Sequence, residues 1–77
     1  MPTTLDQLKP QQSCIVSGFT LEGPVTQRLM QLGVLEGSDI AILRRAPGGD
    51  PIEIRVMGYA LSLRKQEAQT IIVEQIV

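Results

Sequence analysis

The sequence predicts a small, mainly β domain, a five-stranded barrel with one short α-helix between its first and second strands. Three observations lead to this prediction. Turn-forming residues, above all glycine and proline, occur at short intervals along the chain. The segments between them are short and rich in β-branched residues, as is typical of strands. Only one longer segment has the apolar periodicity of a helix.

The predicted helix covers Pro24 to Leu32. Pro24 suits the first helical position, because its missing N–H would be unpaired there in any case. Val25, Leu29 and Leu32 follow the spacing i, i+4, i+7 and form one apolar stripe, which we expect to face the core. Gly33 fits the left-handed residue that commonly ends a helix.

A β-hairpin is predicted after the helix, opened by Gly37. Its arms are Ser38 to Ala46 and Pro51 to Gly58, joined by a four-residue loop, Pro47-Gly48-Gly49-Asp50. Two glycines in a loop can also cradle a phosphate, but the lysine and the strand-to-helix setting of a P-loop are absent. A hairpin turn is therefore the better interpretation.

The register of this hairpin follows from matching its two arms across the loop. Arg44 then lies opposite Glu53, a favourable pair of opposite charges. A slip by one residue would lose this match and turn the apolar side chains to the other face. The same register pairs residues on the face expected to point into the core, namely Leu43 with Ile54 and Ala41 with Val56.

The remaining elements complete the barrel. A helical turn capped by Thr4 precedes the first strand, Ser13 to Phe19, and the segment Lys65 to Gln69 forms a second turn. The last two strands are Tyr59 to Leu63 and Thr70 to Ile76. Five such strands close best as a small SH3-like barrel, a single domain over residues 1–77. Its core is expected to contain Val25, Leu29, Leu32, Ala41, Leu43, Ile54, Val56, Leu61, Leu63, Ile71 and Val73.

Composition argues against several classes of function. The chain has no histidine, the commonest general base, and no spacing of serines or carboxylates suggests catalysis, so we do not expect an enzyme. Seven basic and eight acidic residues give a net charge of −1, which argues against a nucleic-acid module. Phe19 and Tyr59 are too few aromatics for a platform that stacks single-stranded bases.

The single cysteine, Cys14, cannot form an internal disulfide and fits a reducing compartment. We expect it to be a small buried residue of a strand, and the sequence indicates neither a metal site nor a cofactor site. The N-terminus lacks the basic and apolar regions of a signal peptide. No apolar run approaches the ~20 residues of a membrane span, so direct membrane insertion is not expected.

Positive charge is locally concentrated in the hairpin and after the fourth strand. Two interpretations stay open. Basic residues commonly protect strand edges from unwanted pairing; alternatively, they form one basic side for an acidic protein partner. The residues concerned are Arg44, Arg45, Arg55, Arg64 and Lys65.

Three stretches carry a recognisable pattern. Gln27 to Gly37 contains R-L-x-x-L-G at the helix end and a glycine that opens the next strand, Ala46 to Ile52 contains A-P-x-G-D-P, and Leu61 to Ala68 contains L-R-x-x-E-A. In this order and spacing they resemble the ferrous iron transport protein A (FeoA) family, and the opening Leu5 to Pro10 also fits. Members commonly have glycine where this chain has Gln11 or Gln12, so the turn before the first strand departs from the pattern.

The resemblance implies an SH3-like barrel in the bacterial cytoplasm. It also implies an accessory role in ferrous iron transport, through protein–protein interaction with the GTP-binding cytosolic domain of the membrane transporter, the B component of the system. The same fold resembles the C-terminal domain of iron-dependent repressors. A small metal- or ligand-sensing domain, without the DNA-binding domain of those repressors, is therefore the alternative.

A partner-binding surface needs exposed apolar anchors within a polar rim. Met30 lies off the apolar stripe of the helix, and Leu35 lies in a loop where it either contacts a partner or plugs the barrel end. We expect the surface to bind the transporter or a second copy of the chain. Its candidate residues are Arg28, Met30, Val34, Leu35, Pro47, Asp50, Arg64 and Lys65.

Overall fold

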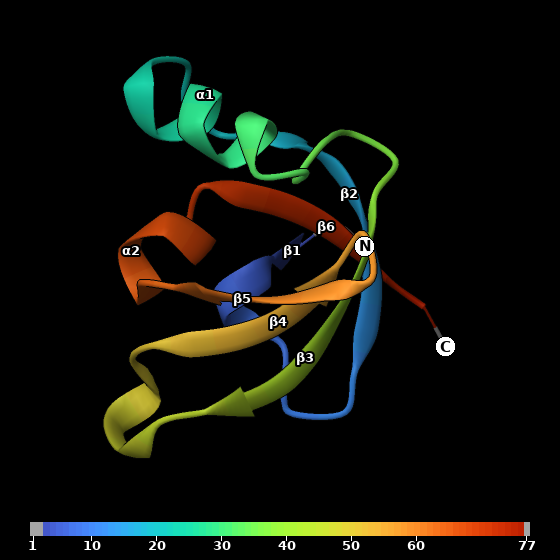
Figure 1. Ribbon diagram of the computed structural model, residues 1–77, viewed down its shortest axis with the longest axis vertical. Helices are drawn as coiled ribbons and strands as arrows, with labels where there is room; N and C mark the ends of the chain where they lie inside the picture. The colour runs from blue at the N-terminus through green and yellow to red at the C-terminus, as the bar shows by residue number, and fades with distance from the viewer. Residues whose placement is uncertain (1–2, 77) are drawn as a thin grey trace.

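The computed structural model describes residues 3–76, in which one antiparallel six-stranded sheet curls into a barrel with the strand order β1-β6-β2-β3-β4-β5 (Figure 1). No helix among these residues is long and apolar enough to cross a membrane. The strands are β1 (Thr3–Thr4), β2 (Ser13–Phe19), β3 (Asp39–Arg45), β4 (Ile52–Val56), β5 (Tyr59–Leu63) and β6 (Ile71–Ile76). The helices are α1 (Pro24–Gln31) and α2 (Lys65–Ala68), with 3-10 turns η1 (Leu5–Gln7) and η2 (Pro47–Gly49).

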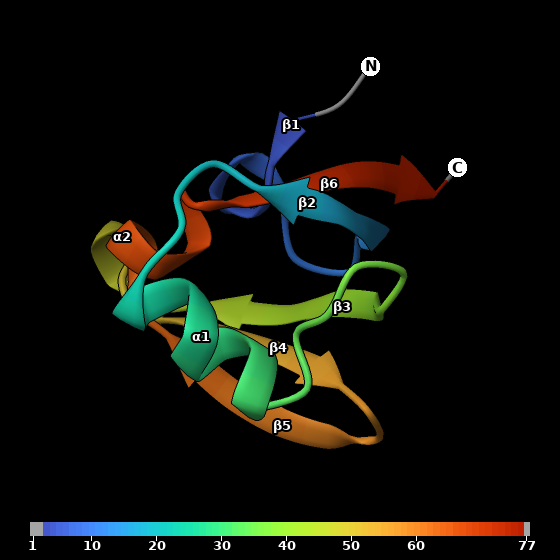
Figure 2. The same cartoon turned by 90° about the horizontal axis from the view of Figure 1, so that it is seen from above.

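Helix α1 covers one end of the barrel, on the side of β4 and β5 and away from β1 (Figure 2). Pro24 occupies its first turn, as predicted, and Gly33 follows its end with a φ of 100°. This φ lies in the left-handed region, which glycine enters without a steric cost. The shorter helix α2 connects β5 to β6.

The strand count differs from the prediction by one. The additional strand β1 consists of two residues, and Thr3 and Thr4 pair with Val73 and Ile72 of β6. The helical turn that follows is a 3-10 turn, and the hydroxyl of Thr4 donates to the carboxylate of Asp6 instead of capping the turn. Two residues between a proline and a turn are too few for a strand pattern to be visible in the sequence.

The predicted register of the β3–β4 hairpin is right at its loop end and wrong further along. Arg44 lies opposite Glu53 as expected, with 2.9 Å between Nε and Oε1. A β-bulge at Leu43 then shifts the pairing, because two residues of one strand oppose one residue of the other. Ile42 therefore lies opposite Ile54, and Ile40 lies opposite Val56, in place of the predicted Leu43 and Ala41.

The bulge decides which side chains of β3 enter the core. Ile40 and Ile42 are almost fully buried, whereas Ala41 and Leu43, which the prediction placed in the core, are half-buried. Leu32 and Leu61 are also half-buried, and Val25 is exposed. The predicted core positions that are confirmed are Leu29, Ile54, Val56, Leu63, Ile71 and Val73. The core also contains residues that were not predicted there, namely Leu5, Leu8, Cys14, Val16, Val34, Ile40, Ile42, Ile52 and Ala68.

The N-terminal segment is tied to the β3–β4 hairpin by a half-buried guanidinium. Nη1 of Arg45 donates to the backbone carbonyls of Asp6 and Leu8, at 2.7 and 2.9 Å. Between this segment and β2 the chain turns at Gln11, whose φ is 75°. The resemblance to the FeoA family implies a glycine at Gln11 or Gln12, and the left-handed backbone of Gln11 is a conformation that glycine adopts without strain.

Candidate partner-binding surface

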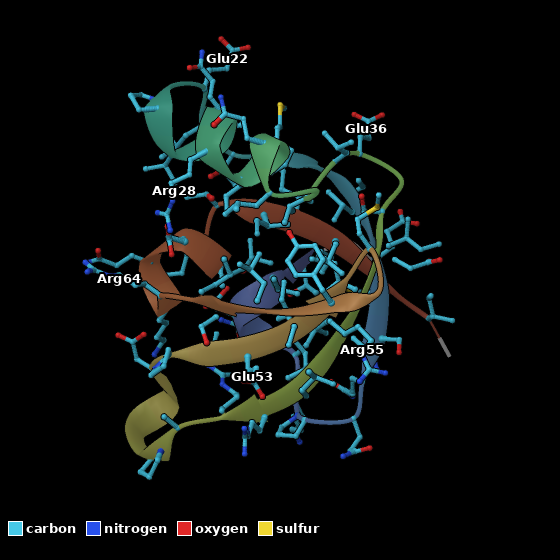
Figure 3. The ribbon with its side chains drawn as sticks, viewed as in Figure 1. Glu22, Arg28, Glu36, Glu53, Arg55 and Arg64 are labelled. Carbon is cyan, nitrogen blue, oxygen red and sulfur yellow. The ribbon has the colours of Figure 1, made fainter. Side chains whose placement is uncertain are left out.

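A groove separates α1 from α2 on the side of the molecule where Figure 3 shows Arg28 and Arg64 near each other. One wall comes from α1 and the segment before it, and the other comes from α2 and the residues that flank it. We call this the α1–α2 groove. It is lined by Leu21, Val25, Arg28, Arg64, Gln66, Glu67 and Thr70.

The carboxylate of Glu67 joins the two walls of the groove. It is 7% exposed, and its Oε1 accepts a hydrogen bond from the backbone N–H of Arg64 at 2.9 Å. Its Oε2 forms an ion pair with Nη1 of Arg28. Both carboxylate oxygens are therefore occupied, and Glu67 fastens α1 to the first turn of α2.

Only one of the guanidinium nitrogens of Arg28, Nη1, takes part in this ion pair. Its side chain is 59% exposed, so the remaining guanidinium donors face water. Arg64 uses its backbone N–H in the groove while its side chain is exposed, and among residues 3–76 that side chain forms no ion pair. The groove thus offers the unpaired guanidinium of Arg64 and the water-facing donors of Arg28 beside a carboxylate that is already paired.

The apolar part of the groove was predicted incorrectly. Val25, expected in the core, is 43% exposed, and Leu21, which the sequence analysis did not single out, is 60% exposed. The backbone at Leu21 is held in place because the hydroxyl of Thr26 donates to its carbonyl at 2.6 Å. The i, i+4 spacing correctly placed Val25 on the stripe of Leu29, but spacing alone does not show how far the barrel extends beneath the helix.

Two more of the predicted residues lie next to the groove. A neighbouring depression is lined by Asp50, Lys65 and, in common with the groove, Arg64. Oδ1 of Asp50 accepts from the backbone N–H of Lys65 at 3.0 Å, which fixes the hairpin loop against α2. The structure therefore brings together four of the predicted residues, Arg28, Asp50, Arg64 and Lys65.

The other four predicted residues do not line the groove. Met30 and Leu35 are 42% and 45% exposed, at and beyond the C-terminal end of α1. Pro47 is exposed at the tip of the β3–β4 hairpin, where it lines a separate depression. Val34 is fully buried, so its side chain belongs to the core and is out of a partner's reach.

The C-terminal end of α1 contacts the β4–β5 turn, a contact that the sequence analysis missed. The hydroxyl of Tyr59 donates to the carbonyl of Leu32. Met57 lies beside Gly33, where a Cβ on that glycine would come within 2.8 Å of the Met57 Cγ. Met57 is also 70% exposed with a φ of 53°, so this turn presents a large apolar side chain from a backbone conformation that favours glycine or asparagine.

Residues 3–76 contain no group of three or more histidine, cysteine, aspartate or glutamate side chains placed to hold a metal ion. Cys14 is buried, as predicted, and desolvation together with the nearby charge of Asp39 raises its pKa to about 11. Its thiol is therefore less acidic than an ordinary cysteine thiol, as expected for a residue of the core.

Comparison with known proteins identifies the domain. The FeoA domain family matches residues 3–75. The Fe(2+) transport protein A/Fe(2+) transporter FeoB fusion protein of Porphyromonas gingivalis is 31% identical over 72 residues, which cover 94% of this chain and 8% of that protein. The present chain thus spans only a small part of the length of this relative, in which the matching domain and a transporter are parts of one protein.

Solved structures of FeoA proteins have the same fold as this chain. An FeoA-like protein from Clostridium acetobutylicum is 38% identical with a TM-score of 0.92, over 99% of this chain and 88% of that one. FeoA of Stenotrophomonas maltophilia, solved with zinc and described as a prokaryotic SH3 domain protein, is 28% identical with a TM-score of 0.82, over 94% and 89%. A manganese-dependent transcriptional repressor shares the fold alone, at 17% identity and a TM-score of 0.88 over 97% of this chain and 41% of that one. The family match over almost the whole chain and these likenesses show that the chain is a member of the FeoA family, with the SH3-like barrel of that family.

Proposed function

We propose that this FeoA-family domain is an accessory protein of bacterial ferrous iron transport that works in the cytoplasm by binding the cytosolic, GTP-binding part of an FeoB-type membrane transporter. The observation that supports this best is the fused relative, in which a homologous domain and the transporter share one chain. Covalent linkage keeps two modules at a high local concentration. Contact between the two modules requires a binding surface on the domain.

The binding surface that we propose includes exposed residues at the C-terminal end of α1 and basic residues that face α2. Met30 and Leu35 supply apolar anchors at the C-terminal end of α1, and basic side chains supply a polar rim near α2. Such a combination of anchor and rim is the usual anatomy of a protein interface. The role is one of binding and modulation, without a reaction of its own.

Co-purification with the full-length transporter in detergent tests this function. The wild-type chain should be retained, and Met30→Glu and Leu35→Ser should each reduce the retained amount by about tenfold or more, as expected for apolar interface anchors. Gln75→Glu adds the same charge to an exposed residue of β6, and Ile15→Ser removes a similarly exposed apolar side chain from β2, so both should be retained like the wild type. No retention of the wild-type chain would contradict the proposed function.

A metal-sensing role is the second candidate, because the Stenotrophomonas maltophilia relative was solved with zinc. Titration of Fe(II) or Mn(II) into the purified chain, followed by calorimetry, separates the two roles. A sensor should bind specifically with a dissociation constant in the micromolar range or tighter, on the order of −8 kcal/mol. Heats no larger than those of dilution would show that the chain does not bind these metals and would contradict a sensing role.

A further inference from the structure

Helix α1 carries more apolar surface than its own barrel covers. Leu29, in the second half of the helix, is fully buried, whereas Val25, one turn earlier, is 43% exposed and Leu21, just before the helix, is 60% exposed. A single exposed apolar residue is common on protein surfaces. Here two of them line the same groove, so the apolar stripe continues past the edge of the core into a place where another chain can cover it.

The charges around this apolar surface favour the binding of a negatively charged group. Glu67 has both oxygens engaged, by Arg28 and by the backbone of Arg64. Arg28 already has Glu67 as its counter-charge and keeps only hydrogen-bond donors facing water, whereas the guanidinium of Arg64 forms no ion pair among the described residues, so the groove carries one excess positive charge. Guanidinium groups bind carboxylates through paired, charge-assisted hydrogen bonds.

We propose that the α1–α2 groove binds an acidic segment of the transporter that places one apolar side chain between Leu21 and Val25 and one carboxylate against Arg28 and Arg64. This inference rests on the proposed function and adds the chemistry of the contact to it. The groove is apolar where a buried anchor would lie and basic at its rim, which is the charge complement of such a segment. Glu67, which is paired with both walls, holds α1 against α2 before the partner binds, so little ordering is needed on binding.

Affinity for the full-length transporter in detergent, measured by biolayer interferometry, tests the groove. Arg64→Glu should weaken binding by about tenfold or more at low salt, since a reversed charge then faces the partner's carboxylate. Leu21→Ser should weaken it by a similar factor because it removes an apolar anchor. The Arg64 side chain and Leu21 are exposed in the free chain, so both variants should keep the wild-type melting temperature.

Two matched variants control for charge and for apolar area. Arg55→Glu makes the same charge change on β4, outside the groove, and Ile15→Ser removes an exposed apolar side chain from β2. Both should bind within about twofold of the wild type, since substitutions outside an interface leave affinity nearly unchanged.

If both groove variants bind the transporter with wild-type affinity, the groove is not the binding site, while the proposed function stands. If the wild-type chain itself does not bind the transporter, both the groove proposal and the proposed function are wrong. Self-association is distinguished by sedimentation of the chain alone. Concentration-dependent oligomers that disappear in Arg64→Glu would show that the groove binds a second copy, which would also overturn the assignment to the transporter.

Discussion

Leu29 and Val25 lie on the same apolar stripe of α1, one helical turn apart, and only Leu29 is removed from water. The energetic role of a residue depends on this burial more than on its type, because apolar stabilisation scales with the area withdrawn from solvent. The same contrast separates Val34, in the core, from its neighbour Leu35, at the surface. Substitutions at these two pairs should therefore have very different consequences.

Leu29→Ala should lower the free energy of unfolding by ~2–5 kcal/mol, because it leaves a cavity among fully buried side chains. A domain of this size is stable by only ~3–5 kcal/mol, so this variant should be largely unfolded at 37 °C. Val25→Ala, from the exposed part of the stripe, should change the stability by less than ~1 kcal/mol. Urea denaturation followed by circular dichroism measures both, and equal midpoints for the two variants would contradict the placement of α1.

Cys14 should make the stability of the fold depend on pH in the alkaline range. Burial, with a smaller contribution from Asp39, raises the pKa of its thiol from the ordinary value of 9.0 to about 11. The unfolded chain therefore releases this proton at lower pH than the folded chain does. The corresponding stability is fully present below pH 9 and is lost as the pH rises from 9 to about 11.

The contribution of Cys14 is isolated by comparison with Cys14→Ala, which shares every other titrating group with the wild type. Between pH 8 and pH 10.5 the wild type should lose ~1–2 kcal/mol more stability than the variant. Urea midpoints at a series of pH values give this difference. Parallel pH profiles of the two proteins would show that the thiol ionises as readily in the folded state as in the unfolded state.

At the scale of elements, irregular backbone positions account for most of what the sequence did not predict. Turn residues and apolar spacing predicted α1 and the strands β2 and β5 closely. The bulge at Leu43 could not be predicted, because every residue around it suits a regular strand and the extra residue is accommodated by tertiary packing. Once one residue is added, the core face of β3 changes from Ala41 and Leu43 to Ile40 and Ile42.

The turn before β2 provides a test of such an irregular position. Gln11→Gly should raise the free energy of unfolding by ~0.5–1 kcal/mol, because Gln11 has a φ of 75° that glycine adopts without strain. Gln12→Gly should lower it, since Oε1 of Gln12 accepts from the backbone N–H of Lys9 at 2.7 Å. The melting temperatures of both variants, compared with that of the wild type, measure these changes. A lower melting temperature for Gln11→Gly would show that the turn is not left-handed at that position.

The Arg44–Glu53 pair tests the half of the hairpin register that was predicted correctly. The two side chains are 77% and 29% exposed, so water screens their attraction. A double-mutant cycle with Arg44→Ala and Glu53→Ala should give a coupling of ~0.2–1 kcal/mol. A coupling above ~2 kcal/mol would mean that the pair is enclosed by other groups, and a coupling of zero at low salt would argue against this register.

At the scale of the whole molecule, a single barrel is closed at one end by α1 (Figures 1 and 2), and α1 also exposes Val25, Arg28 and Met30. The sequence predicted correctly that Arg28 and Met30 are exposed on α1, but it placed Val25 in the core and did not predict the groove that Val25 lines. Arg28, Asp50, Arg64 and Lys65 come from three separate segments, and only the folded chain brings them together around α2. Glu67, which connects α1 to α2, is the glutamate of the L-R-x-x-E-A pattern, but the pattern does not show that its carboxylate reaches Arg28 on α1.

The central claim is that this domain works by binding the transporter, and the most direct test is a titration of the full-length transporter with the wild-type chain. Binding should saturate with a dissociation constant in the micromolar range or tighter, about −8 kcal/mol or more favourable. It should also weaken as salt is raised from about 0.05 to 0.5 M, because basic side chains form part of the contact. A signal that does not saturate at concentrations of about 100 μM would contradict the account.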